Sequence, residues 1–210
     1  MYEFIELEYT GRLKDTNQIF DTTNQEFARS AGIFDEKMKY GAVTVCLGQG
    51  HILKGLEEQL QRKEYNTEFS VTLDADHAFG KKDAKLLKLI PKQTFQRDKV
   101  EPIPGLQVNI DGNIGTIRSV AGGRIIVDFN HPLSGKDIIY TVKILRHVDD
   151  AAEKIKAIFR AEFHLTEVEI AIRGEGVTIK TKHSLPEQIQ QYVTQHCEKL
   201  VGVKNITFAS

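Results

Sequence analysis

The chain has 210 residues, of which 40% are hydrophobic and 27% are charged. This composition supplies enough apolar side chains for one to three packed units and excludes an intrinsically disordered chain. The formal net charge is −1 and the basic residues are spread along the chain, which argues against a binder of nucleic acid or of anionic membranes. We therefore expect neither nucleic acid nor membrane as a partner.

The N-terminal residues and the hydropathy of the chain predict a cytoplasmic protein, and its cysteine usage agrees with that expectation. The N-terminal residues Met1–Glu6 lack the basic leader and apolar run of a secretory signal, and no later stretch is apolar over the length that spans a bilayer. Cys46 lies in a strand-like run and Cys197 in a helix-like one. This usage predicts buried thiols rather than a disulfide framework.

The first part of the chain reads as strands and turns. Phe4–Thr10 alternates apolar and polar side chains, as a half-buried strand does, and Gly11 opens the following turn. Ile19–Asn24 runs from apolar residues into turn formers, and Val43–Leu47 predicts a second strand. The stretch Phe27–Tyr40 between them reads as a loop.

A short amphipathic helix is predicted next, over Ile52–Leu60. Its apolar side chains share one face at helical spacing, which by itself makes them helix core. They are Ile52, Leu53, Leu56 and Leu60. Strand alternation then returns at Glu68–Leu73.

The pattern changes from Leu86 to Phe129, where short strand candidates are separated by Pro and Gly. This predicts a small all-β insert. Its strand candidates are Leu87–Ile90, Leu106–Ile110, Ile114–Ile117 and Arg124–Val127. After the insert, Asp137–Leu145 is apolar on both faces, which is typical of a central strand and closes the first domain.

A further unit begins at Asp149–Asp150, which can cap a helix starting near Ala151. Its remaining elements predict an open sheet with helices on one face, in the order α-β-β-α-β. They are strands at Val168–Ile172 and Val177–Lys180 joined through Gly174–Gly176, a helix at Pro186–Leu200 and a strand at Asn205–Phe208. The hairpin either completes the core of this unit or pairs by its exposed edge with a second copy, and we expect a homodimer.

Several segments carry a family resemblance. Tyr9–Gly11, Ile19–Thr23, Leu47–Glu57 and Ala78–Gly80 resemble the FKBP-type peptidyl-prolyl cis-trans isomerases segment by segment and in order. The stretch from Asn130 to Lys136, followed by Tyr140–Val142, is similar to the return segment of the SlyD-like branch, whose members carry an insert-in-flap domain between these motifs. The further C-terminal domain resembles the long archaeal type of that branch.

The resemblance implies an α+β fold. We expect an FKBP-like antiparallel half-barrel wrapped on a short helix, an all-β insert-in-flap domain and a C-terminal α-β-β-α-β module. The expected domains are an isomerase domain at residues 1–85 plus 130–149, the insert-in-flap domain at residues 86–129 and a C-terminal α+β domain at residues 150–210.

The implied reaction is rotation about an X-Pro amide, whose barrier is ~18–20 kcal/mol. The twisted amide loses resonance, so its nitrogen is more basic and its carbonyl less polar than in the planar ground state. An apolar pocket with a few well-aimed polar groups favours that state. The reaction needs no cofactor and no metal, so we read Asp74–His77 as a loop and His131 as a turn-stabilising residue.

The resemblance also places the residues of the pocket. Asp21 is expected at the rim, and the N–H of Leu53 is expected to donate a hydrogen bond to the substrate. Leu56 and Phe79 stand where relatives have a large aromatic floor and a hydroxyl-bearing tyrosine, which predicts a roomier, less polar pocket with lower turnover. The expected catalytic residues are Tyr9, Asp21, Ile52, Leu53, Leu56, Phe79 and Tyr140, with Phe20, Val43 and Leu133 as substrate-binding residues. Taken singly, Tyr9 would read as a core aromatic and Asp21 as a turn residue.

The insert resembles a chaperone domain that captures unfolded segments through exposed apolar surface, which would raise the concentration of prolines near the pocket. The apolar candidates are Leu87, Leu89, Ile90, Phe95, Ile103 and Leu106. The expected partners are unfolded or partly folded proline-containing polypeptides. The expected function is X-Pro isomerisation during protein folding with capture by the insert, and the alternative is a holdase chaperone with weak or no turnover.

Overall fold

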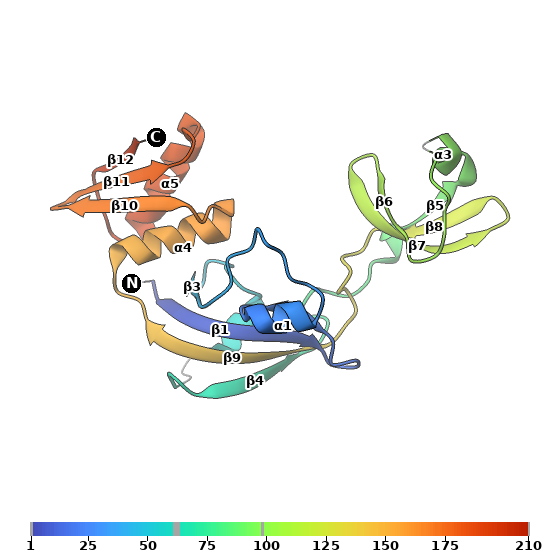
Figure 1. The fold of residues 1–210 in the computed structure, drawn as a ribbon, viewed down its shortest axis with the longest axis horizontal. Coiled ribbons are helices and arrows are strands. Elements are labelled where there is room, and N and C mark those ends of the chain that lie inside the picture. The colour runs from blue at the N-terminus through green and yellow to red at the C-terminus, as the bar shows by residue number, and fades with distance from the viewer. Residues whose placement is uncertain (1, 61–63, 98, 210) are drawn as a thin grey trace. The chain divides into compact units, whose positions relative to one another are not determined.

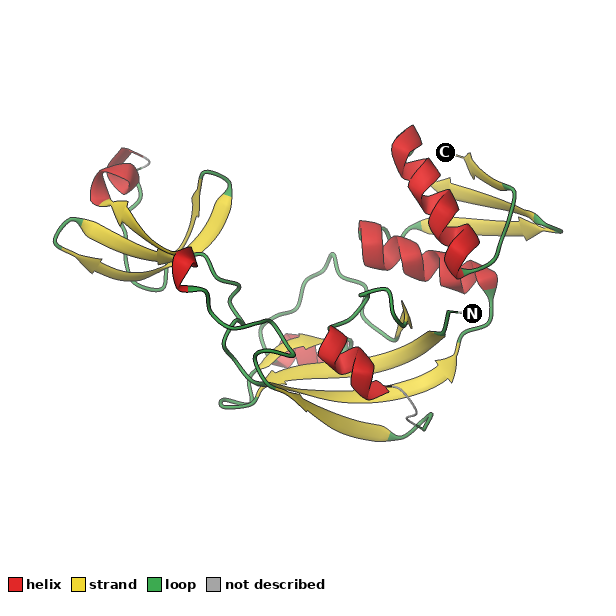
Figure 2. Ribbon diagram, turned by 180° about the vertical axis from the view of Figure 1, so that it is seen from behind, coloured by secondary structure: helices red, strands yellow, loops and turns green. Residues whose placement is uncertain are grey.

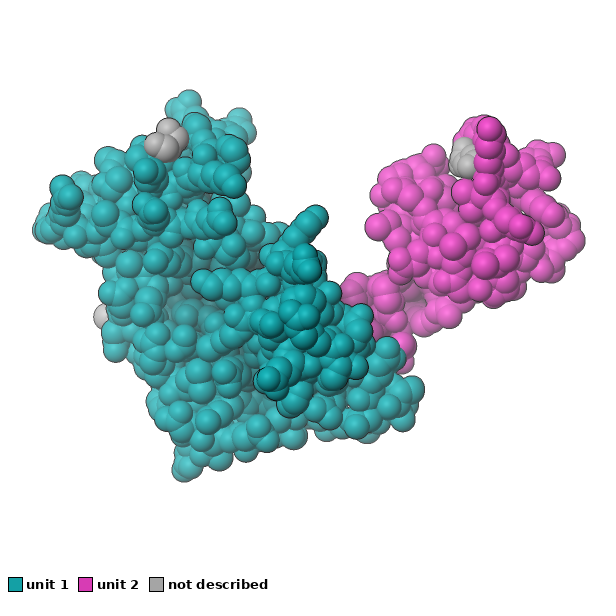
Figure 3. Space-filling view, in the orientation of Figure 1, with its two compact units in different colours: residues 1–73, 137–210 teal, residues 74–136 magenta. Residues whose placement is uncertain are grey.

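The structure is a computed structural model and describes residues 2–60, 64–97 and 99–209. The chain separates into two compact units, residues 1–73 with 137–210 and residues 74–136 (Figure 3). The C-terminal module therefore belongs to the same unit as the first sheet. The finer division into three domains stays a prediction.

A five-stranded antiparallel sheet forms the base of the first unit (Figure 1). Its order is β2-β1-β9-β4, and β3 also pairs with β1. The strands are β1 (Phe4–Leu13), β2 (Ile19–Thr22), β3 (Val43–Cys46), β4 (Glu68–Leu73) and β9 (Ile138–His147). In β1 the apolar Ile5 and Leu7 are buried while Glu8 is exposed, as the alternating sequence predicts.

The strand β9 lies between β1 and β4, which confirms its predicted central position. Its two faces are buried to different degrees. Buried and half-buried residues alternate along it, with Ile138 and Val142 at 0% exposure, because the sheet covers a core on one face only.

Two helices belong to the isomerase-like part. The predicted amphipathic helix is α2 (Lys54–Leu60), which packs beside β4 and buries Leu56 and Leu60. The helix α1 (Gln25–Ser30) overlaps the stretch predicted as a loop, so that prediction was wrong at its start. The side chain of Asn24 caps α1 by accepting a hydrogen bond of 3.0 Å from the N–H of Phe27.

The C-terminal module has the predicted order α-β-β-α-β. Its elements are α4 (Ala151–Phe163), β10 (Val168–Arg173), β11 (Gly176–Thr181), α5 (Glu187–Leu200) and β12 (Ile206–Ala209). Asp150 caps α4 as predicted, accepting a bond of 2.8 Å from the N–H of Glu153. β11 pairs antiparallel with β10 and parallel with β12. Figure 2 shows α4 and α5 on the same side of this sheet.

One hydrophobic core joins the module to the first sheet. Phe4 of β1 and Cys46 of β3 belong to the cluster that also contains Ile158, Phe159 and Cys197, and α4 packs on β3. Both cysteines are free and buried, which confirms the prediction, and burial raises the pKa of each thiol to about 12. Because the core crosses the junction, the module is fixed to the sheet.

The second unit contains a four-stranded antiparallel sheet of order β5-β8-β7-β6. Its strands are β5 (Leu87–Pro91), β6 (Gln107–Ile110), β7 (Asn113–Ala121) and β8 (Arg124–Asp128). The β-rich insert is therefore confirmed. It also holds a 3-10 turn, η1 (Ala84–Leu86), and a short helix that the sequence pattern did not predict, α3 (Lys92–Arg97). Across the described ranges, none of the helices combines the length and apolar character needed to cross a membrane.

Candidate active site

Three aromatic rings from β1, β2 and β9 meet on one face of the five-stranded sheet. The ring of Tyr140 lies 5.7 Å from that of Tyr9 and 5.7 Å from that of Phe20, both in edge-to-face geometry. Aromatic pairs prefer this arrangement because the positive edge of one ring meets the negative face of the other. The structure thus brings three of the predicted pocket residues together.

Gly11 makes this approach possible. It lies within β1 opposite Tyr140, so its prediction as a turn residue was wrong. A Cβ atom at this position would lie 2.7 Å from Phe20 Cζ and 2.8 Å from Tyr140 Cε1. Only a residue without a side chain therefore allows the two rings to pack across the strand.

Asp21 places a carboxylate beside these rings. It pairs with Gly11 across β1 and β2, and it accepts a hydrogen bond from the hydroxyl of Tyr9. Burial, reinforced by the nearby Asp21 charge, raises the pKa of Tyr9 and Tyr140 well above the usual range for tyrosine. Burial also raises the pKa of Asp21, and the bonds from Tyr9 and from the backbone of Thr22 oppose it. The cluster therefore combines one carboxyl group with neutral rings.

Three threonines hold the part of β2 that carries Asp21. The hydroxyls of Thr10 and Thr22 lie 2.8 Å apart in a buried pair. The N–H of Tyr9 donates to Thr23 Oγ1 at 3.0 Å, and the N–H of Thr23 donates to the carbonyl of Tyr9 at 3.0 Å. These bonds hold the end of β2 against β1. The turn-former pattern at this position gave no indication of that role.

The segment between β3 and α2 carries the next group of predicted residues. Ile52 and Leu53 are half-buried, and Leu56 on α2 is 2% exposed. The carbonyl of Leu53 accepts a bond of 2.9 Å from the N–H of Glu57, and the carboxylate of Glu57 accepts one from the N–H of Gly48. Val43 lies half-buried on β3. These residues share the unit of the aromatic cluster, and their roles in the pocket stay predictions.

Phe79 and Leu133 belong to the second unit. The ring of Phe79 stacks on that of His131 at 4.7 Å, and the hydroxyl of Ser134 donates to the carbonyl of Phe79 at 3.1 Å. The N–H of Leu133 donates to Nδ1 of His131 at 3.2 Å, which supports the predicted turn role of this histidine. The expected roles of Phe79 and Leu133 in the pocket stay predictions.

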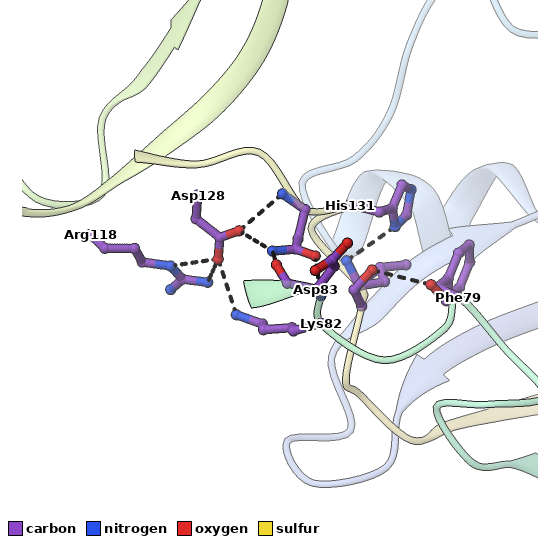
Figure 4. Close-up of polar contacts among 9 residues, drawn as sticks. Phe79, Lys82, Asp83, Arg118, Asp128 and His131 are labelled. Atoms are coloured by element: carbon purple, nitrogen blue, oxygen red, sulfur yellow. Dashed lines mark hydrogen bonds and ion pairs between the residues drawn. The ribbon is translucent and has the colours of Figure 1, made fainter. Parts of the chain in front are cut away.

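A polar cluster that sequence reasoning did not find joins the two segments leading into and out of the insert (Figure 4). Asp128 accepts bonds from Arg118 at 2.8 Å, Lys82 at 3.2 Å and the side chain of Asn130 at 2.8 Å. Burial alone would raise the pKa of Asp128, but these hydrogen bonds outweigh it and hold the pKa well below the usual range. The N–H of Asp83 donates to Asn130 Oδ1 at 2.8 Å, which connects the two segments.

The predicted apolar residues of the insert divide into two groups. Leu87, Leu89 and Ile103 are 44%, 56% and 55% exposed, as a capture surface requires. Phe95 is 3% exposed in the core of the insert, which contradicts its expected surface position, and Ile90 and Leu106 pack partly buried against that core. The apolar spacing alone does not distinguish these two groups.

A hollow of about 850 Å³ on the first unit borders the aromatic cluster at Tyr9, which is one of its lining residues. Its lining includes Glu8, Arg12 and Lys143, which alternate along their strands with the residues that face the aromatic cluster. Charged walls of this kind do not favour the less polar twisted amide. The aromatic cluster is therefore the better candidate site.

Comparison with known proteins identifies the family. The family model described as "FKBP-type peptidyl-prolyl cis-trans isomerase" matches residues 2–96, and the one described as "FKBP26, IF domain" matches residues 88–133. A short-type peptidyl-prolyl cis-trans isomerase of Methanocaldococcus jannaschii is 28% identical over 142 residues, which cover 68% of this chain and 89% of that protein.

Two bacterial relatives agree with this result. The FKBP-type isomerase SlyD of Treponema pallidum is 31% identical over 157 residues, covering 71% of this chain and 77% of that protein. The FKBP-type 16 kDa isomerase of Escherichia coli is 33% identical over 112 residues, covering 51% and 74%. Together with the fold, these similarities show that the chain belongs to the FKBP-type peptidyl-prolyl cis-trans isomerases.

Proposed function

We propose that this isomerase rotates X-Pro amides of folding polypeptides at the aromatic cluster of Tyr9, Phe20 and Tyr140, with Asp21 at its rim. The observation that carries the proposal is the meeting of three rings around Gly11 beside one carboxyl group. Neutral rings provide an apolar wall for a prolyl ring, and the transfer of this ring from water to an apolar surface is favourable.

The physical reason for catalysis lies in the polarity change of the amide. As the bond twists, the carbonyl loses polarity, so transfer from water to the apolar wall disfavours the twisted state less than the planar one. A backbone donor at Leu53 would fix the peptide while its amide turns. The tie between Tyr9 and Asp21 holds the first ring in place, so the pocket does not reorganise during the rotation.

Catalysis is tested with a short X-Pro peptide, whose exchange between isomers is followed by NMR with and without the protein. We expect faster exchange with wild type. Tyr140→Ala, which removes the shared ring, should abolish most of the gain, whereas Tyr65→Ala, an exposed tyrosine at 46% exposure, should keep it. Equal rates for wild type and for the peptide alone would refute the proposal.

We further propose that the insert captures unfolded chains. Leu89 and Ile126 are cross-strand partners on β5 and β8, both exposed, and they alternate with the buried Ile125 and Val127 of the core face. Leu87 adds to the same side of β5, which is an edge strand. Exposed apolar groups at a sheet edge offer side-chain contacts and unpaired backbone groups to an extended polypeptide.

Capture is tested with a double variant, Leu89→Ser with Ile126→Ser, and with Leu165→Ser as an exposed apolar control at 37% exposure in the C-terminal module. We expect the double variant to lose acceleration of proline-limited protein refolding while keeping turnover of a short peptide. If wild type suppresses aggregation but turns over no peptide, the alternative holds and the protein is a holdase.

We also propose a homodimer and a cytoplasmic location. The strand β10 pairs only with β11 among the described residues, so its other edge is open, and Ile172 on it is exposed. Free buried cysteines agree with a reducing compartment. Molar mass measured over a range of protein concentrations tests the dimer, and Ile172→Arg should shift the equilibrium to monomer. A mass of one chain at every concentration would refute it.

A further inference from the structure

A histidine fixes the turn that carries Ile52 and Leu53. Nδ1 of His51 accepts a hydrogen bond of 3.0 Å from the backbone N–H of Cys46 at the end of β3. On the other side of the turn, the carboxylate of Glu57 accepts a bond from the N–H of Gly48. Two side chains, those of His51 and Glu57, therefore hold this turn. The position of the Leu53 backbone then depends on the orientation of the His51 ring.

The other nitrogen of His51 faces the C-terminal module. Because Nδ1 accepts a bond, the proton of the neutral ring is on Nε2. The side chain is 2% exposed, and Nε2 has no hydrogen-bond partner among the described residues. It faces Oε1 of Glu162 on α4 at 3.7 Å. A buried N–H group without a hydrogen bond is costly. The attraction of the nearby Glu162 carboxylate therefore helps to fix the orientation of the His51 ring.

The carboxylate of Glu162 is itself held from α5. Its Oε1 lies 3.2 Å from Nδ1 of His196, and it takes part in a hydrogen bond with the hydroxyl of Tyr192. The ring of Tyr192 stacks on that of His196 at 4.2 Å. Since α4 also packs on β3, the position of this carboxylate is set by the docking of the module.

We propose that Glu162 is a positioning residue of the isomerase, which orients the His51 ring and through it the turn that presents Ile52 and Leu53 to the peptide. The inference rests on the proposed role of that turn in binding the substrate. It assigns the C-terminal module a part in the enzyme: the module supplies the outer support of the active-site turn, through contacts that run from α5 to α4 and then to β3.

Acid is expected to break the hydrogen bond between Cys46 and the His51 ring. A second proton on His51 would sit on Nδ1, so that two N–H groups would face each other at Cys46. Burial lowers the pKa of His51, Glu162 on α4 and Glu57 on α2 act against this shift, and His196 on α5 adds to it. The charged ring would leave Cys46 and turn towards Glu162, which releases the turn.

The experiment compares Glu162→Ala, Glu162→Gln and a control, Glu153→Gln, which removes the same charge from an exposed site on the same helix. For each full-length chain, kcat and KM for a short X-Pro peptide are measured from pH 5 to 8, and the His51 ring is titrated by NMR. We expect Glu162→Ala to raise KM by about two- to thirtyfold with little change in kcat, the range in which changes along a contact network alter coupling.

Glu162→Gln keeps an oxygen that can face Nε2–H of His51, so its KM at pH 7.5 should stay close to that of wild type. It lacks the negative charge, so the titration of His51 and the rise of KM in acid should both move to lower pH. The control should change neither. If circular dichroism shows that Glu162→Ala does not fold, the test uses Glu162→Gln alone. Its readouts are then the shift of the His51 titration and the shift of the acid rise of KM.

Two results would overturn the proposal: KM values and His51 titrations that match wild type in both Glu162 variants, or equal effects from Glu153→Gln. If wild type turns over the peptide and the Glu162 variants match it in KM and in the His51 titration, only this inference is refuted. Wild type without any peptide turnover refutes the proposed site as well, so the two failures are distinguishable.

Discussion

Gly11→Ala tests the central claim that two rings close the pocket across β1. The new Cβ would lie 2.7 Å from Phe20 and 2.8 Å from Tyr140. Carbon atoms pack best at about 3.5–4.0 Å, so the rings must move apart by roughly 1 Å. Overpacking of this kind costs about 1–3 kcal/mol of stability, and a displacement of about 1 Å at a reacting centre can lower the rate by roughly 10²-fold.

The assay measures kcat/KM on a short X-Pro peptide together with the urea midpoint. Gly115→Ala is the matched control, because a Cβ there would lie 2.6 Å from Val127 and 2.8 Å from Phe129 within the insert. Both variants should lose stability by similar amounts, but only Gly11→Ala should lose peptide turnover. Full activity in Gly11→Ala, or an equal loss in Gly115→Ala, would refute the assignment of the pocket to these rings.

Three further predictions concern polar groups. Tyr9→Phe removes the donor to the Asp21 carboxyl group, and should lower kcat/KM by about tenfold, the effect of a lost bond of about 1–2 kcal/mol, in the NMR exchange assay. Asp128 has a lowered pKa in the folded chain, so its stabilisation is present above the unfolded value of about 3.9 and is lost as pH falls below it. The protection factors of the insert amides against hydrogen exchange should therefore fall in acid in wild type, and Asp128→Asn should lose this dependence. Asp150→Ala removes the cap of α4 and should lower the unfolding free energy by about 0.5–2 kcal/mol in urea, while unchanged stability would contradict the cap.

The sequence predicts best those elements whose local pattern and tertiary environment agree. The strand Glu68–Leu73 is found with the predicted bounds, because one face is buried and the alternation reports it directly. The short helix α1 was missed, since six residues leave little periodicity to detect and its cap, Asn24, also reads as a turn former. The parallel pairing of β12 with β11 joins strands separated by a helix, which a local pattern does not specify.

The site was predictable only in part for the same reason. The family resemblance predicted Tyr9, Phe20 and Tyr140 as pocket residues, but their spacing along the chain gives no sign that their rings meet. The need for Gly11 arises from a cross-strand contact, so a local reading as a turn was the natural one. The buried pairing of Asp128 likewise joins residues distant in sequence, and its aspartate has no distinctive neighbours.

The position of β9 beside β1 has a consequence for biosynthesis. On the ribosome, β1 emerges early together with β2 and β3, but it lacks its neighbour β9 until the whole insert and then β9 have left the exit tunnel. The strands of the insert pair with near neighbours in sequence, and such contacts form faster than distant ones. We therefore expect nascent chains to complete the insert first, and the enzyme to acquire activity only after β9 has emerged.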